Sequence, residues 1–312
     1  MNRIIRWYNK NRKMFWLVIV LSVIIVSLPR ILNKYAKRKA ENENSSIINT
    51  TIYNNDNYSI IDEETIKKET NNENTNVISM FIEYCNNKDI ERAYDLLSDK
   101  CKEKLYPTIN QFIDNYYNKI FESRKSYEVQ LWISDENSYT YKVELREDIL
   151  SSGNVNSEAI EDYYTIIKED NSYKMNINNY IGSIEINKTN ETNELKISVL
   201  SKDVFMEYEI YNLKVENKTR NSILVDELES TGTMYLEDKN ALHYQAYNHE
   251  IVKEELRVKG EKKVSIKFNK KYSTKREIKK IVFSNIILNY DEYKTYTNKA
   301  DFKGRGNLEI EL

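Results

Sequence analysis

The spacing of apolar residues changes near residue 122, and this change limits the chain to a fold with helices first and strands afterwards. Before this point apolar residues recur at intervals of three and four, which is typical of one face of a helix. Beyond it they alternate with polar residues, which is typical of a β-strand with one buried face. The sequence therefore predicts an α+β fold in which a helical region precedes antiparallel strands.

Three helices are expected before the change. The first covers Val77–Asn86 and is capped by Asn76, and the second covers Ile90–Leu97 and is capped by Asp89. The third covers Thr108–Phe121 and follows Pro107, a residue favoured at the start of a helix. An antiparallel meander of four strands is expected next, over residues 127–133, 139–145, 163–168 and 173–177.

The segment Phe81–Leu97, FIEYCNNKDIERAYDLL, resembles the opening of NTF2-like domains, and the meander continues the match to Ile177. The resemblance implies a cone-shaped α+β fold with a pocket between helices and sheet. Members of the family range from isomerases to non-catalytic assembly modules, so no single activity follows. An acid or base in such a pocket would come from Asp114, Tyr116 and Tyr117; the alternative is tyrosines in the core and the aspartate in water.

From Ile181 onward the chain is strand-like, which predicts a β-sandwich. Eight short strands are expected, at residues 195–200, 206–216, 223–226, 234–237, 242–247, 255–258, 264–268 and 281–288. The segment Lys214–Val225, KVENKTRNSILV, resembles the strand–turn–strand of immunoglobulin-like domains on Gram-positive surface proteins. The resemblance implies an immunoglobulin-like sandwich over residues 181–312.

An uncharged apolar run, Met14–Leu28, lies near the start of the chain. Extended to Leu32, with Arg30 at the headgroups, it approaches the roughly 20 residues that a membrane-spanning helix needs. No small-residue cleavage site follows it, so we expect an uncleaved single-pass anchor at residues 14–32. Five basic residues flank each side, and the short charged N-terminal tail favours a cytoplasmic segment at 1–13.

These features divide the chain into an anchor, a flexible tether at 33–75, an NTF2-like domain at 76–180 and the sandwich. Both soluble domains are then extracytoplasmic, and the protein is located in the cell membrane. The combination resembles membrane-anchored Gram-positive proteins of clostridial type. It also distantly resembles conjugative-transfer proteins of the TcpC type, which usually carry two NTF2-like modules where this chain has a sandwich.

Charge is distributed unevenly. The first 40 residues contain ten bases and no acid, so the remainder carries 37 basic and 49 acidic residues, which argues against nucleic-acid binding. Within this acidic part, residues 259–280 contain ten bases and two acids. One interpretation is a patch for anionic surfaces, made by Lys262, Lys263, Lys270 and Lys271. The alternative is a solvated strand face and loop.

Residues with reactive or metal-binding side chains are few. Cys85 and Cys101 flank the second helix and are candidates for a disulfide; the alternative is two half-buried thiols. His243 and His249 fit no metal motif, even with Asp238 and Glu250 nearby, so no metal site is expected. The sequence contains no phosphate-binding glycine loop or nucleophile motif, and we expect no cofactor, catalytic residue or small-molecule substrate.

Three functions follow as hypotheses. The first is a non-enzymatic membrane protein with extracytoplasmic binding or scaffold domains, whose partner is another envelope protein. The second is a subunit of a conjugative or other envelope transfer apparatus. The third is an enzyme that uses the NTF2-like pocket, which a deep pocket with a buried aspartate beside a tyrosine would favour and a pocket filled by side chains would exclude.

Overall fold

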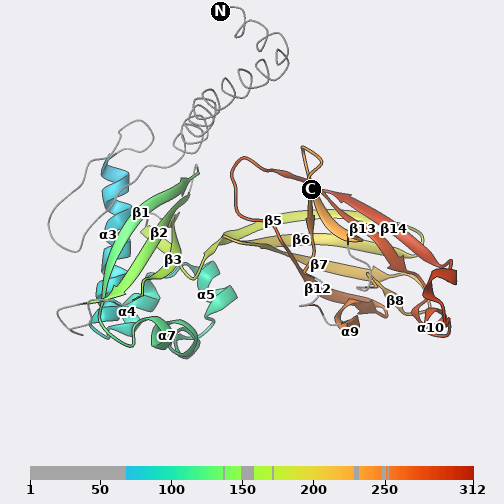
Figure 1. Ribbon diagram of the computed structural model, residues 1–312, viewed down its shortest axis with the longest axis horizontal. Coiled ribbons are helices and arrows are strands. Elements are labelled where there is room, and N and C mark those ends of the chain that lie inside the picture. The colour runs from blue at the N-terminus through green and yellow to red at the C-terminus, as the bar shows by residue number, and fades with distance from the viewer. Residues whose placement is uncertain are drawn as a thin grey trace, which may run out of the picture. The chain divides into compact units, whose positions relative to one another are not determined.

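The computed structural model describes residues 68–135, 138–148, 158–170, 172–227, 232–247, 251 and 253–312 (Figure 1). All of them belong to one compact unit of the chain. The expected anchor at 14–32 lies outside the described residues, as does the expected tether up to residue 67. None of the described helices is long and apolar enough to cross a membrane.

The described chain is α+β, as the change in spacing predicts: a small helical region comes first and antiparallel sheets follow (Figure 1). The helical region comprises α3 (Lys68–Asn86), α4 (Ile90–Asp95), α5 (Asp99–Leu105), α6 (Ile109–Phe112), the π-helical turn η1 (Ile113–Tyr117) and α7 (Asn118–Ile120). The expected third helix is therefore interrupted by a π turn. That turn lies where the neighbouring residues Tyr116 and Tyr117 are both buried.

Helix α3 begins at Lys68, ahead of the expected cap Asn76, so the tether does not extend to residue 75. This part of the helix is polar in sequence, yet Asn71, Asn74 and Thr75 are buried. The hydroxyl of Tyr141 donates to Oδ1 of Asn71 at 2.9 Å and accepts from Nδ2 of Asn74 at 3.2 Å. These hydrogen bonds tie two polar residues of a linker-like sequence to the sheet, although Oδ1 of Asn74 has no hydrogen-bond partner.

The first sheet is a four-stranded antiparallel meander in the order β1-β2-β3-β4, as expected. Its strands are β1 (Lys125–Ser134), β2 (Ser138–Glu147), β3 (Ile160–Glu169) and β4 (Ser172–Asn176). The buried residues of β1 alternate along the strand, as Tyr127, Val129 and Leu131 show. We call the region from α3 to β4 the helix–sheet part.

Two further antiparallel sheets follow, and we call them together the two-sheet part. One has the order β12-β7-β6-β5, from β5 (Tyr180–Glu191), β6 (Leu195–Phe205), β7 (Glu209–Asn217) and β12 (Glu261–Phe268). The other has the order β10-β9-β13-β8-β11, with β14 also paired to β13. Its strands are β8 (Ile223–Leu224), β9 (Met234–Asp238), β10 (His243–Gln245), β11 (Arg257–Val258), β13 (Ile278–Ile287) and β14 (Arg305–Glu311).

Both of these sheets contribute to one hydrophobic core. Inward residues Ile197 and Leu213 come from the sheet of β5, β6, β7 and β12, and Leu236, Phe283 and Ile310 come from the sheet around β13. The strands β5 and β14 are additional to the eight expected, as are the short helices α9 (Lys253–Leu256) and α10 (Tyr290–Tyr293). The eight expected segments all contain strand residues.

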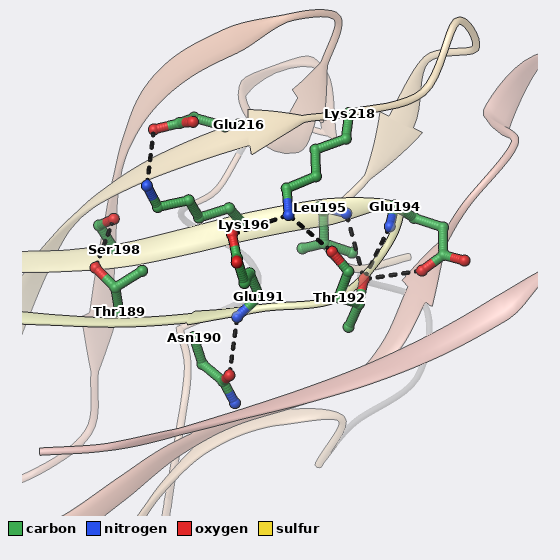
Figure 2. Close-up of polar contacts among 10 residues, drawn as sticks. All are labelled: Thr189, Asn190, Glu191, Thr192, Glu194, Leu195, Lys196, Ser198, Glu216 and Lys218. Carbon is green, nitrogen blue, oxygen red and sulfur yellow. Dashed lines mark hydrogen bonds and ion pairs between the residues drawn. The ribbon is translucent and has the colours of Figure 1, made fainter.

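The hairpin between β5 and β6 is held by polar side chains (Figure 2). Oγ1 of Thr192 accepts from the backbone amides of Glu194 and Leu195, which closes the turn. The ammonium group of Lys218 lies 2.9 Å from both the Glu191 carboxylate and the Thr192 carbonyl oxygen. These contacts join the hairpin to the end of β7, so the cluster is a structural clamp on the surface of the sheet.

Candidate functional site

The space between the helices and the meander is filled by aromatic side chains. Phe81 lies at the centre, with its ring centroid 5.7 Å from that of Tyr164 and 6.3 Å from those of Phe112 and Tyr116. All four residues are buried. The place where the family resemblance implies a pocket is therefore occupied by the core.

The three residues considered for catalysis divide between core and surface. Asp114 is exposed, whereas Tyr116 and Tyr117 are buried. Tyr117 donates to the backbone carbonyl of Cys85 at 3.3 Å. Tyr116 donates to a carboxylate that the sequence analysis did not single out, that of Asp162 on β3, at 2.9 Å.

Asp162 is only 3% exposed, and both of its carboxylate oxygens are engaged. Oδ1 accepts from the backbone amides of Tyr163 at 2.7 Å and Asn179 at 2.9 Å. Oδ2 accepts from the amide of Asn178 at 3.1 Å and from the Tyr116 hydroxyl. Burial raises the pKa of Asp162 to about 6, against the opposing effect of these hydrogen bonds.

These bonds hold the turn that joins β4 to β5. Asn178 and Asn179 both have left-handed backbone conformations, with φ of 59° and 62°, which asparagine tolerates better than most residues. The carbonyl oxygen of Asn179 accepts from the amide of Met206 at 2.9 Å. Asp162 therefore has a structural function, because it fixes the connection between the helix–sheet part and the two-sheet part.

A cavity of about 560 Å³ lies beside this turn. Its lining comes from α5, from β3, from the turn itself and from the segment that joins β6 to β7. The lining residues that matter for its chemistry are Lys104, Glu161, Tyr163, Asp203, Phe205, Glu207 and Tyr208. The volume is within the range of small-molecule sites in proteins.

Each carboxylate in the cavity wall has a lysine partner. Lys104 lies 3.1 Å from Asp203 and Lys142 lies 2.7 Å from Glu161. Lys271 lies 2.7 Å from Glu207. Of these lysines only Lys104 is itself part of the lining, so the wall presents one ammonium group and three carboxylates, each carboxylate paired with a lysine.

The aromatic residues of the wall are held by other side chains. Phe205 and Tyr208 stack with their ring centroids 4.6 Å apart, and the ammonium group of Lys267 lies 4.0 Å from the Tyr208 centroid. Tyr163 packs edge-on against Trp132, with centroids 5.7 Å apart. These contacts fix the rings before any ligand arrives.

The four lysines expected to form an anionic-surface patch are placed differently from one another. Lys263 is exposed, and Lys262 donates to the backbone carbonyl of Glu254 at 2.7 Å. Lys271 is exposed and paired with Glu207. Lys270 is only 2% exposed, and its ammonium group lies 2.6 Å from the Glu209 carboxylate, so it cannot belong to a surface patch.

The two cysteines are buried free thiols, and no disulfide joins them in this structure. Cys85 lies on α3 and Cys101 on α5. Burial raises the pKa of Cys101 to about 12 and raises that of Cys85 further. Both thiols are therefore protonated at neutral pH and weakly nucleophilic.

Of the two histidines, only His243 lies among the described residues. His249 and Glu250 lie outside them. The His243 ring stacks on Tyr235 at 4.1 Å, and its Nε2 lies 3.2 Å from Glu237. Asp238 accepts from the amides of Asn240 and Leu242. Within the described ranges, no group of His, Cys, Asp and Glu residues is arranged to hold a metal ion.

Neither Asp162 nor the cavity was predicted from the sequence. Asp162 lies two residues before Tyr164 and four before Ile166, so the three share the inward face of β3. A carboxylate at an inward position of a strand is a sequence signal that could have identified it. The cavity has no such signal, because its lining comes from segments separated by up to about 100 residues. Searches for matching family models, curated relatives and similar solved structures found no match to this chain.

Proposed function

We propose that the protein is a non-enzymatic, single-pass membrane protein whose extracytoplasmic domains bind a partner at the cell envelope. In this proposal residues 14–32 form the anchor, the helix–sheet part is NTF2-like and the two-sheet part is an immunoglobulin-like sandwich. The order of elements, with helices before a meander and two antiparallel sheets around one core after it, supports these assignments.

One observation carries the proposal of a binding function. The interior of the helix–sheet part is filled by aromatic rings, whereas an open cavity of about 560 Å³ lies at the turn between the two parts. Ligand sites often lie where two structural units meet. The cavity is therefore the proposed binding site.

A specific observation also bears on the enzyme hypothesis. Asp162 and Tyr116 form the pair of a buried aspartate beside a tyrosine that the hypothesis calls for. Four hydrogen bonds occupy the Asp162 carboxylate, and aromatic rings fill the space in front of Tyr116. This arrangement supports a structural function for the pair, and we propose no reaction for it.

Photo-crosslinking from the cavity tests the proposed function. A photoreactive residue placed at Glu207, which is exposed and lines the cavity, should give specific crosslinks in intact cells. The matched control places it at Glu292, an acid outside the cavity lining. Equal labelling from both positions, or none from Glu207, would contradict the proposal.

The orientation of the chain has its own test. Protease added to intact cells without their wall should digest residues 68–312 if these lie outside the membrane. Full protection of the same residues would show the reverse topology. The sequence leaves both orientations open, because the basic residues flanking the apolar run are equal in number.

A further inference from the structure

The walls of the cavity combine aromatic rings with carboxylates. Tyr163, Phe205 and Tyr208 provide aromatic rings, and Asp203 and Glu207 provide carboxylates. The following inference rests on the proposed binding function and names the chemical class of the ligand.

The partly buried charge pair of the wall favours a ligand without strong charge. A cationic ligand at Asp203 would have to displace Lys104 before it gained a partner, whereas the exposed pair of Lys271 and Glu207 contributes little to this preference. An anionic ligand would meet the same carboxylates and be repelled by them. A neutral ligand with many hydroxyl groups can accept from Lys104 and donate to the carboxylates while the ion pairs stay in place.

One acceptor in the wall lacks a donor. Oδ2 of Asp203 is bound by Lys104 and by Nδ2 of Asn212, whereas Oδ1 has no hydrogen-bond partner. Asp203 is 6% exposed, so bulk water does not readily compensate this oxygen. A ligand hydroxyl that reaches Oδ1 would supply the missing donor and leave the contacts of Oδ2 with Lys104 and Asn212 in place.

The aromatic residues complete the match. The C–H faces of a sugar ring are apolar and pack well against tyrosine and phenylalanine, whose rings are large and lose little conformational freedom. Here the rings of Phe205 and Tyr208 are already held by stacking and by Lys267. Preorganised walls of this kind reduce the entropic cost of binding.

We infer that the cavity beside the β4–β5 turn binds a neutral, polyhydroxylated ligand, namely a segment of an oligosaccharide. Binding should be nearly independent of salt, because no net charge is transferred. A cationic or anionic ligand would instead bind more weakly as the salt concentration rises.

The test uses the full chain in a detergent without a sugar headgroup, titrated with maltotriose, with the trimer of N-acetylglucosamine and with trilysine. At least one trisaccharide should bind, with an affinity that changes less than about twofold between low and high salt. Tyr208→Leu should weaken binding by about tenfold, and Tyr208→Phe should retain it.

Tyr290→Leu is the matched control, because Tyr290 also stacks on an aromatic ring and lies under a lysine but is not part of the cavity. The inference fails if trilysine binds and neither trisaccharide does, if no trisaccharide binds at millimolar concentration, or if Tyr290→Leu weakens binding as much as Tyr208→Leu. A protein crosslinked from Glu207 together with no sugar binding would overturn this inference and leave the proposed function standing. If neither a crosslink from Glu207 nor sugar binding is observed, both this inference and the proposed function are overturned.

Discussion

The buried ion pair between Lys270 and Glu209 allows a quantitative test of the packing inside the two-sheet part. The Lys270 and Glu209 side chains are 3% and 1% exposed, and their charged atoms lie 2.6 Å apart. Glu209 also interacts with Lys202 at 3.3 Å and accepts from the Tyr211 hydroxyl at 2.9 Å. One carboxylate therefore compensates two ammonium groups at the end of the sheet.

Replacing Lys270 with methionine should destabilise the protein by about 3 kcal/mol. Removal of one partner from a buried ion pair typically costs about 3–5 kcal/mol, because the other charge stays buried. The lower end applies here, since Lys202 still faces the Glu209 carboxylate. Lys270→Gln keeps a hydrogen-bond donor and should cost less, about 1–2 kcal/mol.

Lys263→Met is the matched control, because Lys263 lies in the same basic segment but is exposed. Its effect on the free energy of unfolding should stay within about 0.5 kcal/mol. Urea unfolding followed by circular dichroism measures all three variants. In a Glu209→Gln background, Lys270→Met should cost less than in the wild type, since the carboxylate that it leaves unpaired is gone.

The reasoning would be refuted if Lys270→Met and Lys263→Met were equally stable. Equal effects would mean that Lys270 is solvated, as the surface-patch hypothesis assumes for all four lysines.

Three further predictions follow from the helix–sheet part. Because the pKa of Asp162 is raised to about 6, its stabilising contribution is present below about pH 4 and is lost as the pH rises through 6. Asp162→Asn should therefore cost more stability at pH 4 than at pH 7, by up to about 3 kcal/mol for a pKa raised by about two units. A larger cost at pH 7 in urea unfolding would show that hydrogen bonding to the carboxylate outweighs its burial. A fragment of residues 68–180 should be more stable than one of residues 76–180 by about 2 kcal/mol, because only the longer fragment keeps the hydrogen bonds of Asn71 and Asn74 to Tyr141. Equal melting curves would show that the first turns of α3 do not stabilise the fold. Cys85 and Cys101 should react with a maleimide only after unfolding, two thiols per chain, whereas a chain that needs reductant before it reacts would contain the disulfide expected from the sequence.

Periodicity was enough to predict the class of fold and the meander, because apolar residues alternate with polar ones along most of each strand. Phe112 and Leu131, on the expected third helix and first strand, are buried, whereas Tyr84 and Leu96, on the first two expected helices, are only partly buried. The same logic could not predict β5, whose residues from Glu185 onward are mostly exposed and polar at the edge of a sheet. An edge strand that buries little apolar surface carries little hydrophobic pattern.

The polar residues were harder to interpret, for a physical reason. Asn71 and Asn74 resemble a linker, and Lys270 resembles a surface charge, until Tyr141 and Glu209 supply the partners that make burial favourable. Such partners lie far away in the sequence, so composition alone cannot distinguish a solvated polar residue from a buried and satisfied one. The cavity shares this property, since four separate segments form it.

The pairing of β13 has a consequence for the order in which the chain folds. In the first meander every strand pairs with its neighbour in sequence, whereas β13 pairs with β9 and β8 before it and with β14 after it, across intervening segments. Folding rates fall as contacting residues become more distant in sequence. The meander should therefore form early in refolding, and the sheet around β13 should wait for loop closure. During that interval the unpaired edges of β13 can pair with other chains and so favour aggregation. The pairing of β13 is therefore the folding step expected to limit recovery of the native protein.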